Sequence, residues 1–275
     1  MGSLRRPRNR LRNSEKVNIA VIGGTGFEGL FKSAKSLRVK TLYGTAPVLF
    51  IGAVDSRKVA FLPRHGLNHS VPPHKINYKA NIDALHKLGV ERIITTNAVG
   101  AINRDFQPGD VVVPHDLIDF TKTRPTTFYD KAPVTHIDMS QPYCPEIREL
   151  LIRTARGKGL QVRDKAVLVC TEGPRYETPA EIEMFRRLGA DIVGMTSCPE
   201  ATLARELEMC YATVCYVSNM AAGMQRRLSA FEVSKVSKKI LPVIGEALTE
   251  AIKGLPFKRE DHCSCSSALK DARFQ

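Results

Sequence analysis

Residues 166–195 carry the pattern that most constrains the fold. An apolar run at Ala166–Cys170 leads into a turn at Gly173-Pro174, a helical pattern follows from Pro179 to Leu188, and a second apolar run occupies Ile192–Met195. This order predicts strand, loop, helix and strand. Open α/β sheets bind ligands beyond their strand ends, so the polar residues that follow the two runs are candidates for a binding site.

The same alternation extends over most of the chain. Apolar runs at 17–22, 48–54, 58–62, 92–96, 111–113, 117–120 and 211–217 alternate with helical patterns at 77–88, 145–159, 201–208 and 230–252. We therefore predict a single α/β domain with a mixed, mostly parallel sheet flanked by helices. The expected organisation is a flexible basic arm at 1–14, the domain at 15–255 and a polar, loose tail at 256–275.

Charge and hydropathy narrow the class of protein. The chain lacks a run of about 18 apolar residues and the continuous apolar segment of a secretory signal, so we expect a cytoplasmic protein with no membrane partner.

The net charge of +13 comes from Lys and Arg residues that are scattered, apart from a cluster at 5–10. A nucleic-acid role for the basic arm is the weaker interpretation, because no aromatic stacking platform accompanies it. A positive field also suits an anionic small substrate.

The seven cysteines divide into two groups. Five internal cysteines lie in or beside apolar runs and are expected to be buried thiols: Cys144, Cys170, Cys198, Cys210 and Cys215. Cys263 and Cys265 lie in the polar tail, where we expect exposure. They lack the partner Cys or His pairs of a zinc site, so no metal site is predicted; a disulfide in the tail or to another subunit stays open.

Polar residues at four predicted strand ends resemble an anion site when they are taken together. They are the Gly23–Gly26 turn with Thr25, the Arg64-His65 pair, Asn97-Ala98 and Thr196. Taken singly, each has an ordinary explanation as a turn, a solvated pair, a turn former or a helix cap. Together they offer hydroxyls, backbone N–H groups and a fixed charge, which suit a phosphate dianion. The P-loop Lys-Ser/Thr is missing, which favours phosphate as an attacking group over a nucleotide.

Gly24, Gly26 and Gly29 also satisfy the spacing G-x-G-x-x-G. A dinucleotide-binding fold needs a helix directly after this turn and an acidic residue about twenty positions later. The segment 30–41 has no clear apolar face, and residues 42–54 contain no acid. The sequence therefore argues against an NAD-dependent dehydrogenase.

Six motifs in order give the chain a recognisable resemblance. They are Ile22-Gly23-Gly24-Thr25-Gly26, Arg64-His65-Gly66, Asn77-Tyr78-Lys79-Ala80-Asn81, Gln107-Pro108-Gly109-Asp110, Glu172-Gly173-Pro174-Arg175 and Gly194-Met195-Thr196-Ser197-Cys198-Pro199-Glu200. The chain resembles the trimeric purine nucleoside phosphorylase superfamily, and most closely the 5'-methylthioadenosine phosphorylase family. The similarity runs from about Ile19 to Leu248.

The resemblance implies a pentosyltransferase of purine salvage that uses phosphate to split a purine nucleoside, or its 5'-methylthio form, into base and (5-methylthio)ribose 1-phosphate. It implies no cofactor beyond the phosphate co-substrate, and a homotrimer or a dimer of trimers. The phosphate contacts that it implies are Thr25, Arg64, His65, Ala98 and Thr196. The nucleoside contacts are Asn97, Met195, Tyr176, Glu177, Asn219, Met220 and Ala221.

The base-binding residues differ from those of the adenine-cleaving relatives. Those relatives have two aspartates at the positions of Asn219 and Ala221, and a small residue at the position of Glu177. Superfamily members that use 6-oxopurines carry this Glu with an Asn. A Glu177 carboxylate accepts the N1–H of a 6-oxopurine, whereas adenine has no such proton. The two residues, which we assign to catalysis, favour a 6-oxopurine; the whole-chain resemblance favours methylthioadenosine. Both remain open, as does a purely local role for Glu177 as a helix cap and for Asn219 as a turn residue.

The sugar side favours the methylthio family. His136 matches a histidine that in relatives reaches the site of a neighbouring subunit, which implies the trimer. Val233 and Val236 match an apolar wall for a methylthio group. Packing of the last helix into the core explains both valines equally well.

Overall fold

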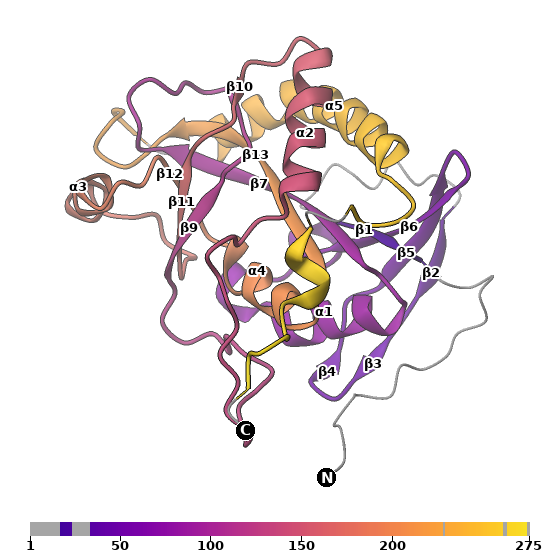
Figure 1. Cartoon of the computed structure of the whole chain (residues 1–275). Helices are drawn as coiled ribbons and strands as arrows, with labels where there is room; N and C mark the ends of the chain where they lie inside the picture. Colours follow the sequence, from indigo (N-terminus) through magenta and orange to yellow (C-terminus); the bar gives the residue numbers. More distant parts are fainter. Residues whose placement is uncertain (1–16, 24–33, 228, 261–262, 274–275) are drawn as a thin grey trace.

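A mixed, mostly parallel sheet forms the centre of the molecule (Figure 1). The computed structural model describes residues 17–23, 34–227, 229–260 and 263–273. Within them β1 pairs in parallel with β6 and β7, and β7 pairs in parallel with β13. Along the main path of the sheet the strands are β10 (Val162–Arg163), β8 (Val111–Val112), β13 (Cys210–Met220), β7 (Arg92–Ala101), β1 (Ile19–Gly23), β6 (Arg57–Pro63), β5 (Leu49–Val54) and β2 (Lys35–Leu37).

A second group of strands extends the sheet from the C-terminal end of β7, at Gly100 and Ala101. There β12 (Ile192–Gly194) pairs antiparallel with β7. β11 (Val167–Thr171) then lies between β12 and β9 (Asp116–Phe120), parallel to both. A small separate hairpin joins β3 (Lys40–Thr41) to β4 (Gly44–Thr45). The strand-helix-strand unit expected at 166–195 is confirmed, because α3 (Pro179–Arg187) connects β11 to β12.

Helices cover both faces of the sheet, as the alternation of side chains along β1 requires. Ile19 and Val21 face a core shared with α2 (Pro145–Gly157) and α5 (Ala230–Gly254). Ala20 and Ile22 face a second core with α1 (Tyr78–Lys87) and α4 (Ser197–Glu206). The predicted α/β class is thus confirmed (Figure 1). Among the described helices, none is long and apolar enough to cross a membrane.

Strands β7 and β13 are longer than their apolar runs. β7 continues through Asn97 to Ala101, and β13 continues through Asn219 to Met220, with a bulge in the pairing between Val217 and Asn219. The interpretation of Asn97 and Asn219 as turn residues is therefore wrong. Both amides project from a paired, buried backbone, which holds them more rigidly than a turn would.

Residues 263–273, the C-terminal segment, pack onto the domain, contrary to the expectation of a loose tail. Cys263 and Cys265 are 5% and 3% exposed, and a short 3₁₀ helix spans Ser264–Ser267. Both cysteines join the core formed by α2 and α5. The prediction that these two thiols are exposed and lack partner cysteines is wrong, because their partners are distant in sequence: Cys144 and Cys210 lie beside them.

Candidate active site

A cavity of about 1010 Å³ lies along the C-terminal halves of β7 and β13 and at the C-terminal ends of β6 and β12. Its size suits a small organic ligand. Most of the residues predicted for the site line it: Arg64, His65, Asn97, Ala98, Tyr176, Glu177, Met195, Thr196, Asn219, Ala221 and Val233. The structure thus brings together residues from six separate segments. Thr25 and its glycine-rich turn lie outside the described residues.

Arg64 is buried and forms a bidentate ion pair with Glu200. Its Nε and Nη2 donate to the two carboxylate oxygens at 2.6 and 2.9 Å, and both side chains are almost fully inaccessible. Although burial works to lower it, the Glu200 carboxylate raises the pKa of Arg64 above its ordinary value. A guanidinium has five N–H donors. The pair fixes the orientation of Arg64 at the cavity wall and leaves donors for an anion.

The backbone of β7 presents a donor beside this guanidinium. Arg64 Nη1 donates to the carbonyl of Thr96 at 2.9 Å. The pairing of β7 with β1 ends at Thr95. In a strand, the backbone groups of alternate residues point to the same edge, so the N–H of Ala98 points to the same edge as the Thr96 carbonyl. Ala98 is exposed. Its N–H and Arg64 therefore converge on one part of the cavity.

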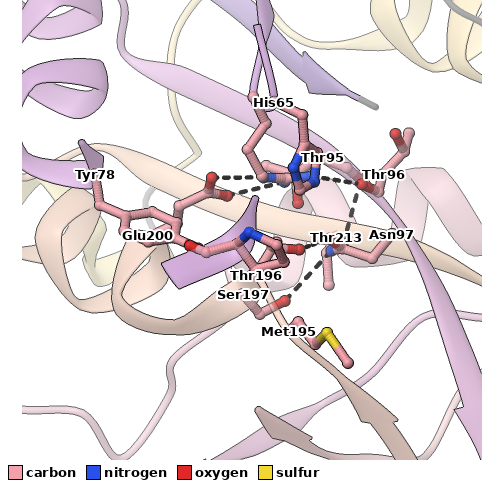
Figure 2. A network of polar contacts seen from close by, with 12 residues as sticks. His65, Tyr78, Thr95, Thr96, Asn97, Met195, Thr196, Ser197, Glu200 and Thr213 are labelled. Carbon is pink, nitrogen blue, oxygen red and sulfur yellow. Dashed lines mark hydrogen bonds and ion pairs between the residues drawn. The ribbon is translucent and has the colours of Figure 1, made fainter. Parts of the chain in front are cut away.

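The side chain of Asn97 holds neighbouring hydroxyl groups in place (Figure 2). Its Nδ2 donates to Thr213 Oγ1 at 2.7 Å and to Ser197 Oγ at 3.3 Å, while Oδ1 accepts from Thr196 Oγ1 at 2.5 Å. Thr196 precedes α4, but its side chain does not cap the helix. Thr196 is thus the N-cap residue of α4 by position, as expected, but its hydroxyl donates to Asn97 and makes no capping hydrogen bond. Asn97 instead holds the Thr196 hydroxyl at the cavity, where its oxygen retains lone pairs for a ligand's O–H.

The side chain of His65 is a neutral imidazole near pH 7. Burial, reinforced by the neighbouring Arg64 charge, lowers the pKa of His65 to about 4. Nδ1 lies 2.8 Å from the carbonyl of Val71, so it carries the ring proton and donates it. Nε2 then has a lone pair. The ring also stacks on His69 with centroids 4.2 Å apart, which fixes its plane.

Glu177 is a ligand-binding candidate rather than a helix cap. The cap of α3 is Thr178, whose side chain accepts from the backbone N–H of Glu181 in a capping box. Glu177 Oε1 instead accepts a hydrogen bond from Thr171 Oγ1, at the end of β11, at 2.7 Å. This bond orients the carboxylate in the cavity wall and uses one of its two oxygens.

Asn219 faces the same cavity from the bulge of β13. Its Oδ1 accepts from Ser218 Oγ at 2.7 Å, and its Nδ2 donates to the backbone carbonyl of Met220 at 2.9 Å. The second Nδ2 proton remains for a ligand. Gly100 provides the space, because a Cβ there would lie 3.3 Å from Asn219 Nδ2. Buried Ala221 lines the wall nearby.

Three predicted contacts lie outside this cavity lining, as far as the structure describes the chain. Met220 packs against the core around β11 and β13, and Val236 packs against the core of α2 and α5. Of the two valines, only Val233 reaches the cavity, because α5 turns the Val236 side chain toward the core. His136 is exposed on the loop that precedes α2.

Two functional residues were missed at the sequence level. Glu200 belongs to a quoted motif, but its partner Arg64 is 136 residues away. Arg124 is buried and donates to the backbone carbonyls of Met195, Cys198, Thr171 and Glu172, at 2.6–3.2 Å. It therefore ties the loop after β11 to the loop after β12. The unusual length of the irregular segment 121–144, which contains Arg124, was the available signal.

The fold and this cavity define a nucleoside phosphorylase type of architecture, and the chain belongs to the phosphorylase superfamily, whose family model matches residues 18–253. The chain is 51% identical to the 6-oxopurine nucleoside phosphorylase of Pyrococcus furiosus, over 92% of this chain and 98% of that protein. It is 51% identical to a probable S-methyl-5'-thioinosine phosphorylase of Methanopyrus kandleri, over 93% and 99%. It is 43% identical to the S-methyl-5'-thioadenosine phosphorylase of Thermofilum pendens, over 94% and 99%.

Solved structures agree with this assignment. A methylthioadenosine phosphorylase from an Antarctic soil metagenomic library superposes with a TM-score of 0.89 at 34% identity, covering 94% of this chain and 93% of that one. Methylthioadenosine phosphorylase from Schistosoma mansoni in complex with adenine gives 0.88 at 31% identity, covering 94% and 99%. The predicted family and fold are confirmed.

The lowered pKa of His65 predicts a pH dependence of stability. Between pH 6.5, the ordinary value, and about 4, the unfolded chain takes up a proton that the native site resists. The free energy of unfolding should therefore fall as pH falls through this window. Melting curves in phosphate-free buffers should show that the wild type loses more stability from pH 7 to 4.5 than His65→Gln does. Parallel curves for the two proteins would contradict this assignment.

Proposed function

We propose that this enzyme splits 6-oxopurine nucleosides, including 5'-methylthioinosine, by phosphorolysis. The general reaction, phosphorolysis of a purine nucleoside or 5'-methylthionucleoside by a pentosyltransferase, follows from the superfamily and from relatives named for it. The observation that carries the finer proposal is that one cavity combines donors for an anion, around Arg64 and Ala98, with Glu177 and Asn219 for a base.

The proposed chemistry places phosphate on one face of the ribose. The bond from C1' to the purine N9 breaks, positive charge develops on the sugar, and a phosphate oxygen bonds to C1'. Arg64 and the N–H of Ala98 hold the phosphate, and a protonated phosphate oxygen donates to His65 Nε2 or to Thr196. Met195 packs against the ribose. The reaction requires no cofactor beyond phosphate.

The departing base takes the bonding electrons, so it needs donors near N7. We assign this role to Asn219 Nδ2, which has a proton to spare. Glu177 accepts the N1–H of hypoxanthine or guanine through its second oxygen. An adenine would present a lone pair at N1 to the same carboxylate, and unmatched polar contacts of this kind cost orders of magnitude in kcat/KM. The relatives from Pyrococcus and Methanopyrus, whose names specify 6-oxopurine and thioinosine substrates, support this choice.

The 5' end of the nucleoside is proposed to lie along α5. Val233 and Leu241 line the cavity there together with Ser234, Ser237 and Lys238. Such a mixed wall accommodates both a 5'-methylthio group and a 5'-hydroxyl. We propose that the protein forms a homotrimer in which His136 completes the cavity of a neighbouring subunit, because His136 is exposed and lies away from the cavity of its own chain.

The phosphate role of Arg64 can be tested in a background that avoids an unpaired buried charge. Replacing Arg64 alone would leave Glu200 unpaired at a cost of about 3–5 kcal/mol. Arg64→Gln combined with Glu200→Gln should instead raise the KM for phosphate at least about tenfold, since charge-assisted hydrogen bonds contribute about 1.5–3 kcal/mol. The control is Glu183→Gln, which removes a carboxylate from the exposed face of α3 and leaves the buried pair intact. Equal phosphate KM values in the double variant and this control would remove Arg64 from the phosphate site.

Base choice can be tested by exchanging the two discriminating residues. Glu177→Ser with Asn219→Asp should shift the ratio of kcat/KM for methylthioinosine over methylthioadenosine at least about tenfold toward adenine, because the acceptor for N1–H is lost. Glu183→Gln is the matched control, since it removes a carboxylate from the exposed face of α3. An unchanged ratio in the double variant would place base choice elsewhere while leaving phosphorolysis itself untouched.

A further inference from the structure

Four of the seven cysteines converge on one buried point away from the cavity. Cys144 immediately precedes α2, Cys210 begins β13, and Cys263 and Cys265 come from the C-terminal segment. Their four sulfur atoms all lie within 4.8 Å of one another, and all four residues are buried. Cys263 Sγ lies 3.8 Å from Cys144 Sγ and 3.4 Å from Cys210 Sγ.

These distances match a metal centre better than disulfides. Zinc binds thiolate sulfur at about 2.3 Å in a tetrahedron, which places neighbouring sulfurs about 3.8 Å apart. A disulfide needs sulfurs about 2.05 Å apart. The set also has the composition of a closed structural site, with four sulfur ligands and a C-x-C pair from one short segment joined by two distant cysteines.

The surroundings compensate the charge that such a centre carries. Four thiolates around a divalent cation have a net charge of −2, which is costly to bury alone. The guanidinium of Arg205, on α4, is 4% exposed and donates to Cys265 Sγ at 3.5 Å and to Ser264 Oγ at 3.4 Å. A buried cation that donates to a ligand sulfur offsets part of this negative charge and helps to orient the ligand, as outer-shell partners of metal sites do.

We propose that Cys144, Cys210, Cys263 and Cys265 bind one zinc ion that fastens the C-terminal segment to the domain. The consequence extends beyond the cysteines. Ala272 accepts a backbone hydrogen bond from His136 at 2.8 Å, and Arg273 forms a β-bridge with Thr135. The zinc therefore also fixes the backbone of the loop that carries His136. This proposal stands independently of the substrate assignment.

The first test is the metal content and thiol count of the full-length protein, purified without reductant from cells grown with zinc. Elemental analysis by mass spectrometry should find one zinc per chain. Alkylation with iodoacetamide after denaturation with EDTA should modify all seven cysteines of the chain. Five or three modified cysteines would show one or two disulfides and overturn the proposal, as would seven free thiols without bound metal.

The second test uses variants and a conformational readout. Cys263→Ser with Cys265→Ser should lose the bound zinc, whereas Cys215→Ala, which removes a buried thiol of β13 outside the cluster, should keep one zinc per chain. If the double serine variant does not fold, EDTA treatment of the wild type serves instead. Removal of zinc should increase hydrogen exchange at the amide of His136. Exchange at this amide that is unchanged after verified zinc loss would overturn the proposed anchoring.

Discussion

The buried ion pair between Arg64 and Glu200 is the interaction on which the cavity depends. It joins the C-terminal end of β6 to α4. The hydroxyl of Tyr211, from β13, donates to the Glu200 carboxylate at 2.9 Å. Thr95 Oγ1 in turn donates to the Tyr211 hydroxyl at 3.2 Å. Three strands and a helix thus share one polar network. Breaking a buried pair of this kind leaves an uncompensated charge, so the fold and the geometry of the site are secured by the same contacts.

The pair also determines how the cavity treats an anion. Because Glu200 neutralises the formal charge of Arg64, the phosphate that we propose for this site meets directed N–H donors rather than a large positive field. His65, neutral through its lowered pKa, adds a lone pair that can accept a phosphate O–H. Of the Lys and Arg residues in the described part of the chain, Arg64 and Lys238 line this cavity. The net charge of +13 attracts anions to the protein without fixing their geometry.

Helices and strands depend on patterns of neighbouring residues, and these elements could be predicted well from the sequence. Contacts between residues far apart in the sequence could not. Hydrophobic periodicity predicts the sheet, the helices and the convergence of strand ends. It correctly predicts a strand, a helix and a strand within residues 166–195. Asn97 and Asn219 interrupt that periodicity, so the apolar runs stopped short of the true ends of β7 and β13. The partners of Glu200 and of Cys263 are 136 and 119 residues away. No local pattern encodes such pairings, which is why the ion pair and the cysteine cluster appeared only in the fold.

We propose that one cavity combines phosphate attack with recognition of a 6-oxopurine. The most direct measurement is base release by the wild-type enzyme from inosine, methylthioinosine, adenosine and methylthioadenosine in parallel, with and without phosphate. We predict release that requires phosphate and a clear preference for the two inosine compounds over the two adenosine compounds. Release that is independent of phosphate, or a preference for the adenosine compounds, would contradict the account.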